Sequence, residues 1–319
     1  GPHAEVMALR DAAQRGCSVA GATAYVTLEP CSHQGRTGPC CEALTRAGVV
    51  RVVASITDPN PLVAGQGCAR LRATGVRVDV GLGALESREL NLGFFSRMVR
   101  KTPWVRMKIA ASLDGATALA NGNSQWMTSP AARKDGHAWR ARACAVLTGI
   151  GTVLADNPRL NVREVATDRQ PGLVVVDSAM SMPLDASIFI AERPLFIYTS
   201  AKNEAKKRAL EARGATVVVL PGPNGKVDLG AMLRDLGQRE MNELHVEAGF
   251  TLNGSLVREG FVDELLVYLA PKLVGQGQGM LQWGPLTELS QALALNITSL
   301  NMVGPDVRLV ARVVGRDCF

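Results

Sequence analysis

The sequence predicts an α/β protein made of two domains. Its 319 residues are about twice the usual domain length of roughly 150 residues. Strand and helix patterns alternate through most of the chain, which favours layered domains with parallel strands. A basic segment at residues 97–103 ends in proline and separates two such series. We therefore expect domains at residues 1–100 and 101–319.

The first domain begins with an amphipathic helix at residues 3–15. Val6, Leu9 and Ala13 share one face of this helix, and Gly16 ends the pattern. The later elements are shorter and are bounded by turn residues. In order, we expect a strand at 22–28, a helix at 39–47, a strand at 50–56, a helix at 67–74, a strand at 76–80 and a helix at 85–98.

The second domain begins with a strand and ends with a hairpin. Ser129 and Pro130 are typical of a helix N-terminus, where a capping hydroxyl is followed by proline. The last two strands have no helix pattern between them, so we expect a hairpin that closes a largely parallel sheet. The expected strands are 104–111, 145–147, 173–177, 195–198, 216–220, 243–247, 264–273, 295–302 and 307–314, and the expected helices are 130–142, 203–213 and 229–241.

Composition and charge argue against several classes of protein. The net charge of +6 is spread without a dense basic block, and aromatic residues make up only 4% of the chain, so no nucleic-acid partner is expected. No run of about 18 apolar residues and no secretory leader is found, which predicts a cytoplasmic protein with no membrane partner. Seven cysteines at irregular spacing favour a metal site or inert thiols over disulfides.

Three residues of the first domain have the side chains of a catalytic zinc site. His3 is followed by Cys31 and, after eight intervening residues, by Cys40. One imidazole and two thiolates give three ligands, and catalytic zinc leaves its fourth position to a water that is deprotonated near neutral pH. Glu5 has the carboxylate that would move protons from this water to a ring nitrogen and a leaving amine.

The spacing of these residues leaves alternatives open. Residues i and i+2 of a helix point about 200° apart, so His3 and Glu5 can face one metal only at a frayed helix start. Cys41 competes with Cys40 as the second thiolate. Taken singly, His3 is typical of a surface histidine and Cys31 of a buried thiol. Together they match the His-x-Glu and Pro-Cys signature of zinc nucleobase deaminases, with a longer gap before the last cysteine.

A phosphate-binding segment is the strongest cofactor feature of the second domain. It follows the strand at 243–247 and opens a helix, where glycine lets backbone N–H groups approach an anion. The Gly-x-Gly-x-x-Gly spacing is missing, so a Rossmann fold is not predicted, and a glycine that merely ends a strand is the alternative. The segment consists of Gly249, Phe250, Thr251, Leu252, Asn253, Gly254 and Ser255.

These motifs, in this order, resemble those of the bifunctional riboflavin-biosynthesis deaminase/reductases along nearly the whole chain. The resemblance implies a cytidine-deaminase-like three-layer domain followed by a dihydrofolate-reductase-like domain. The motifs that carry it are Pro2-His3-Ala4-Glu5, Leu28-Glu29-Pro30-Cys31, Asp58-Pro59-Asn60-Pro61, Ser112-Leu113-Asp114-Gly115, Ser124-Gln125-Trp126, Thr152-Val153-Leu154-Ala155-Asp156, Val246-Glu247-Ala248-Gly249 and Ala270-Pro271-Lys272.

The resemblance also implies two reactions and two cofactors. A Zn²⁺-dependent hydrolysis would remove the ring 2-amino group of 2,5-diamino-6-ribosylamino-4(3H)-pyrimidinone 5′-phosphate as ammonia, and NADPH would then reduce the ribosyl group to ribityl. The implied partners are this small phosphorylated pyrimidine and further copies of the chain, in a dimer or tetramer. The residues alone do not separate NADPH from NADH, because no arginine is clearly assigned to a 2′-phosphate.

The resemblance implies the site residues position by position. Lys108 and Glu247, on strands expected to border the pocket, are our candidates for moving the proton as the ribose ring opens, and a purely binding role is the alternative for each. Arg140 and Arg163 could hold the ribose phosphate as bidentate donors, and a surface arginine is the alternative for each. Arg36, between the two cysteine ligands, would also meet a phosphate, and a solvated loop arginine is the alternative. The expected NADPH contacts are Ala110, Trp126, Thr152, Asp156, Ser178 and residues 249–255, and the expected substrate contacts are Ser124, Arg140, Leu160, Arg163, Glu247 and Arg36.

The sequence departs from this family in two places. Family members have a further stretch before Pro-His-Ala-Glu, with a helix, two strands and an Asn-Pro-x-Val-Gly segment that lines the deaminase pocket. We do not find this stretch, so we expect that the N-terminal portion of the deaminase domain is missing and that its pocket is incomplete. Gly38 replaces the first proline of the family's Thr-Pro-Pro-Cys motif, which loosens the loop before Cys40 without removing a ligand.

A nucleic-acid or free-nucleoside deaminase with an accessory α/β domain is the rival hypothesis. It shares the zinc motif, but it gives no role to the second domain. A further alternative is that one domain has lost its activity and serves as a scaffold. For the first domain, the zinc motif argues against that, and the N-terminal stretch that we do not find argues for it.

Overall fold

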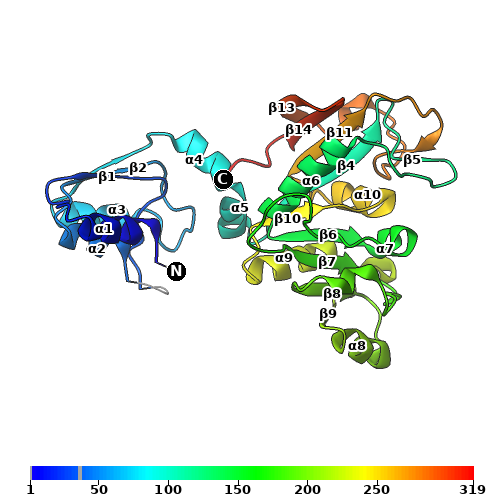
Figure 1. Ribbon diagram of the computed structural model, residues 1–319, viewed down its shortest axis with the longest axis horizontal. Helices are drawn as coiled ribbons and strands as arrows, with labels where there is room; N and C mark the ends of the chain where they lie inside the picture. The colour runs from blue at the N-terminus through cyan, green and yellow to red at the C-terminus, as the bar shows by residue number, and fades with distance from the viewer. Residues whose placement is uncertain (1, 35–37) are drawn as a thin grey trace. The chain divides into compact units, whose positions relative to one another are not determined.

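The computed structural model describes residues 2–34 and 38–319, and the chain forms two compact units (Figure 1). One unit consists of the chain up to Arg100 together with Phe319, and the other is Lys101–Cys318. Both units contain parallel strands joined by helices, which confirms the predicted α/β class. No helix within the described residues is long and apolar enough to cross a membrane.

The first unit is a small parallel sheet packed against helices. Its elements are α1 (Ala4–Gln14), β1 (Thr23–Val26), α2 (Cys40–Arg46), β2 (Arg51–Ala54), α3 (Gln66–Ala73), β3 (Arg77–Val80), α4 (Ala84–Leu90) and α5 (Leu92–Arg100). The strands lie in the order β1-β2-β3. Leu44 of α2 and Leu71 of α3 join Val52 and Val78 in one apolar core. Burial of this face holds the helices against the sheet.

The helix expected at residues 85–98 is in fact two helices, α4 and α5, which meet at Asn91. Asn91 has φ −120°, outside the helical region, and its side chain donates a hydrogen bond to the Ser87 carbonyl at 2.8 Å. Asparagine forms such local bonds readily, so it ends a helix that the apolar periodicity alone would continue.

The C-terminal residue belongs to the first unit. The Phe319 ring lies 5.7 Å from the Phe95 ring, and the Arg100 guanidinium lies 4.6 Å from the Phe319 ring centre. The sequence placed this residue with the second domain because a boundary drawn along the chain cannot show which unit a terminus contacts.

The second unit is built on a sheet of nine strands. They lie in the order β13-β14-β11-β4-β10-β6-β7-β8-β9, parallel from β11 to β9, with β13 and β14 as the antiparallel hairpin that the sequence predicted (Figure 1). The bounds are β4 Trp104–Ser112, β6 Ala145–Gly149, β7 Gly172–Val176, β8 Leu195–Thr199, β9 Ala215–Val219, β10 Glu243–Val246, β11 Glu264–Ala270, β13 Leu295–Val303 and β14 Asp306–Val313. A separate pair, β5 (Ala118–Leu119) and β12 (Gly277–Gln278), is too short for a sequence pattern.

Helices and short turns cover both faces of this sheet. They are α6 (Pro130–Arg142), α7 (Ile150–Asp156), η1 (Ser187–Ile190), α8 (Glu204–Glu211), η2 (Pro223–Gly225), α9 (Leu229–Gln238), α10 (Phe250–Arg258) and η3 (Leu289–Gln291). Ser129 caps α6 as predicted, because its side chain accepts a hydrogen bond from the Ala132 amide at 3.3 Å. Successive residues of a strand point to opposite faces, so Val146 and Leu147 of β6 belong to two different apolar cores.

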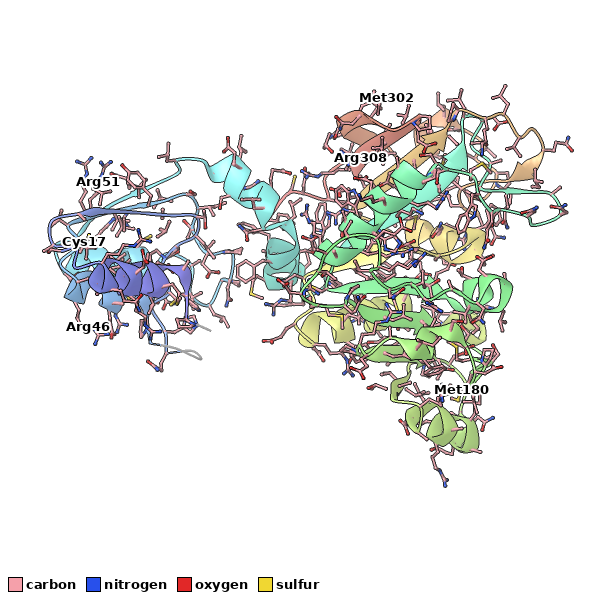
Figure 2. All side chains as sticks on the ribbon, viewed as in Figure 1. Cys17, Arg46, Arg51, Met180, Met302 and Arg308 are labelled. Atoms are coloured by element: carbon pink, nitrogen blue, oxygen red, sulfur yellow. The ribbon has the colours of Figure 1, made fainter. Side chains whose placement is uncertain are left out.

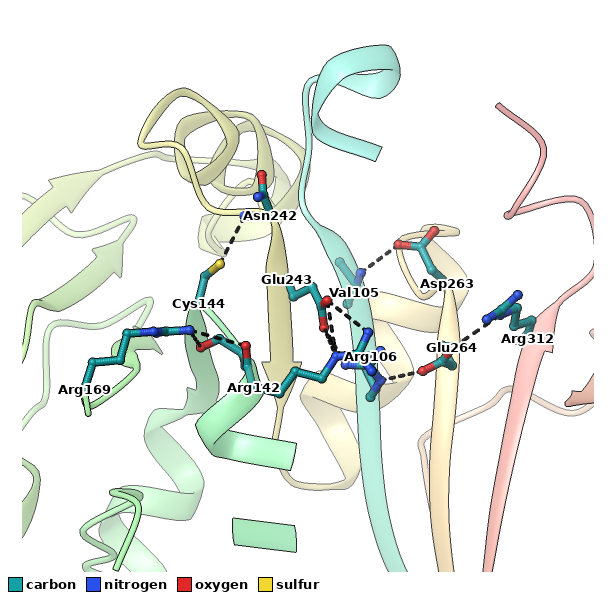
Figure 3. A network of polar contacts seen from close by, with 11 residues as sticks. Val105, Arg106, Arg142, Cys144, Arg169, Asn242, Glu243, Asp263, Glu264 and Arg312 are labelled. Atoms are coloured by element: carbon teal, nitrogen blue, oxygen red, sulfur yellow. Dashed lines mark hydrogen bonds and ion pairs between the residues drawn. The ribbon is translucent and has the colours of Figure 1, made fainter. Parts of the chain in front are cut away.

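A buried ionic network ties together the amino-terminal ends of β4, β10 and β11 (Figure 3). Arg106 is only 2% exposed and pairs with Glu243 at 2.9 Å and with Glu264. Arg312 of β14 reaches the second oxygen of Glu264 at 3.3 Å. Buried charges are tolerated when each is paired in this way. The network leaves these buried charges paired at the end of the sheet opposite the carboxyl ends of the strands.

Candidate active sites

In the first unit, the side chains of His3, Cys31 and Cys40 converge. Their potential ligand atoms all lie within 4.8 Å of one another. The His3 Nδ1 atom is 3.3 Å from Cys40 Sγ and 3.5 Å from Cys31 Sγ. One imidazole nitrogen and two sulfurs at this spacing fit the three-ligand set of a catalytic zinc ion.

Local backbone geometry brings His3 and Glu5 to the same place. His3 precedes α1 as its N-cap with extended backbone (φ −68°, ψ 160°), and Glu5 lies in the first helical turn. The two residues therefore do not point apart as they would inside a regular helix. Burial and then the nearby Glu5 carboxylate raise the pKa of the Cys40 thiol. A bound dication would favour the thiolate and so oppose this shift.

Cys40 and Cys41 have different surroundings. Cys40 opens α2, and its amide donates to Cys31 Sγ at 3.3 Å. Cys41 is 1% exposed and packs in the apolar core with Leu44. Successive helical residues point about 100° apart, so only one of the two can join His3. The structure brings Cys40 into that position.

Glu29 organises the segment that carries Cys31. Its buried carboxylate accepts hydrogen bonds from the amides of Asp58 (3.1 Å), Gly65 (2.8 Å) and Cys68 (3.0 Å). These bonds fix the loop after β2 against the start of the cysteine segment. The sequence analysis gave Glu29 no role. A charged residue at the end of an apolar strand, directly before Pro30-Cys31, could have indicated a buried carboxylate with hydrogen-bond partners.

The second unit contains a cleft of about 1430 Å³ at the carboxyl ends of its strands. Residues that follow β6, β7 and β10 line it, as do residues of β4. Sites in parallel sheets usually lie at this edge. Pockets for one small ligand measure roughly 300–1,000 Å³, so this cleft is large enough for a cofactor and a substrate together.

The structure gathers most of the predicted reductase residues in this cleft. Those that line it are Lys108, Ala110, Ser124, Trp126, Arg140, Thr152, Asp156, Leu160, Arg163, Ser178, Glu247, Gly249, Phe250, Thr251, Leu252, Asn253 and Ser255. Gly254 does not line it. A Cβ atom there would lie 2.3 Å from the Gln282 carbonyl oxygen, so this glycine serves helix packing and not phosphate approach. Arg36 lies outside the described residues.

Glu247 is held between cations at the base of the cleft. Arg140 donates to both of its carboxylate oxygens, with 2.9 Å from Nη2 to Oε2, and Lys108 Nζ lies 3.9 Å from Oε2. Burial alone would raise the pKa of Glu247, but Arg140 lowers it well below its ordinary value. Burial lowers the pKa of Lys108, and Glu247 offsets only part of this effect. The pair is therefore a fixed anion beside an ammonium whose pKa lies below that of an ordinary lysine.

Arg140 and Arg163 are not equivalent as phosphate ligands, although the sequence treated them alike. Arg140 uses Nε and Nη2 for Glu247 and Nη1 for the Asn161 carbonyl at 3.1 Å. Arg163 is exposed in the cleft, and within residues 2–34 and 38–319 its guanidinium makes one hydrogen bond, from Nη1 to the Asn161 side chain at 3.5 Å. Arg163 thus keeps donors for a phosphate, whereas those of Arg140 are largely occupied.

The N-terminus of α10 faces the same cleft. Gly249 is its N-cap, and the first helical residues, Phe250, Thr251 and Leu252, line the cleft. Their backbone N–H groups have no acceptor within the helix, and the helix dipole favours an anion there. This arrangement suits the pyrophosphate of a dinucleotide.

His137 is a cleft residue that the sequence analysis missed. It is 3% exposed, and its Nδ1 accepts a hydrogen bond from the Arg163 amide at 3.2 Å. Burial, and after it Arg140 and Arg163, lower the pKa of His137 to about 4, so it is neutral at physiological pH. Its spacing of three residues from Arg140 on one helix was the available signal.

Two family models match the chain. The cytidine and deoxycytidylate deaminase zinc-binding region matches residues 1–56, and the RibD C-terminal domain matches residues 103–309. The second match gives the second unit a catalytic role of its own. A nucleic-acid or free-nucleoside deaminase with an accessory domain is therefore not favoured.

Relatives over nearly the whole chain agree with these models. Riboflavin biosynthesis protein RibD of Escherichia coli (strain K12) is 44% identical over 322 residues, which cover 97% of this chain and 86% of that protein. The structure of Acinetobacter baumannii RibD, form 1, has a TM-score of 0.88 at 38% identity and covers 98% of this chain and 86% of that one.

A third relative carries a more explicit description. It is a structure from Thermotoga maritima, described as a diaminohydroxyphosphoribosylaminopyrimidine deaminase/5-amino-6-(5-phosphoribosylamino)uracil reductase. Its TM-score is 0.84 at 27% identity, over 98% of this chain and 85% of that one. The expected cytidine-deaminase-like and reductase folds are confirmed. The chain belongs to the RibD family of bifunctional riboflavin-biosynthesis proteins, with a zinc-binding deaminase domain and a reductase domain for a nicotinamide cofactor.

Proposed function

We propose that the chain deaminates 2,5-diamino-6-ribosylamino-4(3H)-pyrimidinone 5′-phosphate and then uses NADPH to reduce the ribosyl group of the product to ribityl. The observation that carries this proposal is one chain with two different sites. His3, Cys31 and Cys40 converge in the first unit, and Lys108 and Glu247 meet in a cleft of the second. The description of the Thermotoga maritima relative names the same pair of reactions.

In the deaminase, His3, Cys31 and Cys40 would hold the zinc ion. Zinc, when bound, supplies a water that loses its proton near neutral pH. Glu5 would carry that proton to the ring nitrogen, and would then carry the remaining proton of the added hydroxyl to the departing amine, which leaves as ammonia. Its position beside Cys40 supports this role, because the carboxylate must lie next to the metal without occupying a ligand position.

In the reductase, a bound nicotinamide cofactor would supply a hydride to the ribose C1′, and the protein would supply position and a proton. The ring oxygen needs a proton as the ring opens, and Lys108 donates it. Glu247 orients the Lys108 ammonium, and Arg140 keeps Glu247 ionised. Arg163 binds the ribose phosphate, because its guanidinium keeps unused donors in the cleft.

The preference for NADPH over NADH rests on the part of the cleft near β7. Ser178 follows β7, and its hydroxyl accepts a hydrogen bond from the Val227 amide at 3.2 Å. Lys226, which precedes Val227 in the chain, also lines the cleft. The substrate end of the cleft is at β4 and β10, so an extended dinucleotide places its adenosine ribose toward β7. A cation there favours a 2′-phosphate.

We also propose that the chain forms a homo-oligomer through the outer edge strand β13. Leu295, Ile297, Leu300 and Met302 share one face of this strand because a bulge shifts the register after Ile297. The last three are each more than 60% exposed, and Figure 2 shows Met302 at this edge. Residues 273–305 contain a single charged side chain, Glu288. A second copy suits such a surface, because a two-fold interface places identical residues together without repulsion.

The test of the proposed reactions follows both in one solution. Ammonia and NADPH absorbance are measured after the diamino compound is added to zinc-loaded protein, with NADH as the comparison cofactor. The proposal predicts ammonia release followed by loss of NADPH, and slower oxidation of NADH. No conversion of either the diamino compound or its deaminated product would reject the assignment.

A further inference from the structure

The loop at residues 157–163 forms hydrogen bonds with several other segments of the second unit. It follows α7 and carries Leu160 and Arg163, which line the cleft. Side chains and amides from other segments hold it. These contacts are Ser187 N to Asn157 Oδ1 (2.7 Å), Arg140 Nη1 to Asn161 O (3.1 Å), Gln170 Nε2 to Val162 O (2.9 Å) and Arg163 N to His137 Nδ1 (3.2 Å).

Arg193 makes the contact at the centre of this loop. Its Nη1 donates to the Leu160 carbonyl at 2.6 Å, and its Nη2 donates to the Arg159 carbonyl. The rigid fork of one guanidinium thus holds two successive carbonyl groups. Leu160 needs such support, because its φ of 50° lies in the left-handed region that non-glycine residues disfavour.

Arg193 also adds a fixed positive charge behind the loop. Burial and the nearby Arg140 lower the pKa of Arg193 to about 10, so it remains protonated at neutral pH. Its Nε is buried and has no hydrogen-bond partner among the described residues. The charge therefore stays beside the loop, where it adds to those of Arg140 and Arg163 and favours a phosphate group.

We propose that Arg193 is a positioning residue for the reduction, because it holds the loop at residues 157–163 in the conformation that receives the substrate phosphate. Arg193 itself is not among the residues that line the cleft, so it acts through Leu160 and Arg159 and does not touch the substrate. This inference rests on the proposed function, which places the ribose phosphate against Arg163 of this loop.

Steady-state kinetics of the full chain test this role, with the deaminated substrate and NADPH varied separately. Arg193→Gln is expected to raise the KM for the phosphorylated substrate about tenfold, because a neutral amide loses the charge and can replace only one of the two hydrogen bonds to the loop. The kcat and the KM for NADPH stay near the wild-type values. Arg193→Lys restores part of the loss, because an ammonium keeps the charge without the fork. The matched control is Arg213→Gln, which removes a guanidinium that stacks 5.2 Å from the Phe189 ring outside the cleft.

A binding measurement separates this inference from the proposed function. Calorimetry with ribose 5-phosphate as the probe requires no turnover. Wild type and Arg213→Gln are expected to bind it equally, and Arg193→Gln more weakly by a similar factor. Equal binding by all three proteins, or no binding by the wild type, overturns the positioning role. The role is also overturned if Arg193→Gln lowers kcat, raises the KM for both the substrate and NADPH to the same extent, and lowers the melting temperature. A wild-type chain that binds the probe but reduces no substrate rejects the proposed function alone.

Discussion

The Lys108 ammonium lies 3.9 Å from the Glu247 carboxylate because β4 and β10 are adjacent parallel strands. Met107 is the register partner of Val246, so the next residue along each strand is again a neighbour. Arg140 holds Glu247 as an anion, and burial lowers the pKa of Lys108. The proton donor that we propose, Lys108, therefore has a position fixed by the sheet and a pKa lowered by its burial.

Replacement of Lys108 tests this proton donor. Lys108→Met is expected to lower kcat for the reduction by about 10²- to 10⁴-fold, the usual value of general acid catalysis, and to leave ammonia release unchanged. The wild-type reduction rate falls as the pH rises through the pKa of Lys108, which lies below that of an ordinary lysine. NADPH absorbance across a pH series measures both effects. A variant with wild-type kcat would remove Lys108 from the chemistry.

Substitutions of two neighbouring cysteines, Cys40 and Cys41, test the assignment of the zinc ligands. Cys40→Ala is expected to lose the metal, because two of three ligands do not hold catalytic zinc at ordinary affinity. Cys41→Ala keeps the zinc and loses about 1 kcal/mol of stability from the apolar core. Mass spectrometry measures the zinc content of each variant, and urea unfolding measures its stability. The ligand assignment is wrong if Cys41→Ala loses the metal and Cys40→Ala retains it.

His137 predicts a dependence of stability on pH. The folded chain takes up its proton near pH 4, whereas the unfolded chain takes it up near pH 6.5. More protons are bound to the unfolded state between these values, so stability falls as the pH falls through this window. His137→Gln removes that contribution. Urea unfolding at pH 7 and pH 5 should therefore show a smaller difference for the variant, and an equal difference would contradict the depressed pKa.

The β13 surface is tested by one charge. Ile297→Lys places like charges together in a two-fold interface and is expected to shift the chain toward the monomer in sedimentation velocity. Val50→Lys is the control, because Val50 is 54% exposed in the other unit and Ile297 is 64% exposed. A monomeric wild-type chain, or equal association of both variants, would reject this interface.

The sequence predicted the parallel strands and the closing hairpin well, because long apolar runs between turn residues admit few other structures. It missed α7, because the N-cap of this helix is Gly149, which offers no capping side chain as a signal. It also joined α4 to α5, because a side-chain hydrogen bond of Asn91 decides that break and apolar spacing does not show it.

At the sites, too, the sequence could not predict contacts that depend on the folded structure. Motif resemblance selected residues that lie in the cleft, but it could not show how their donors are used. Arg140 is committed to Glu247, and Gly254 faces the backbone at Gln282. The contacts of Arg193 with Leu160 join residues that are 33 positions apart. Such contacts depend on the three-dimensional packing and leave no local pattern in the sequence.

A mixing experiment tests the central claim, that one chain carries two separate catalytic sites. Glu5→Gln is expected to lose ammonia release but to reduce the deaminated compound, and Lys108→Met is expected to show the reverse. Neither variant alone converts the diamino compound to the ribityl product, and an equimolar mixture of the two does. Loss of both activities in either single variant, with the fold and zinc content of Lys108→Met intact, would contradict the assignment of the two reactions to two sites.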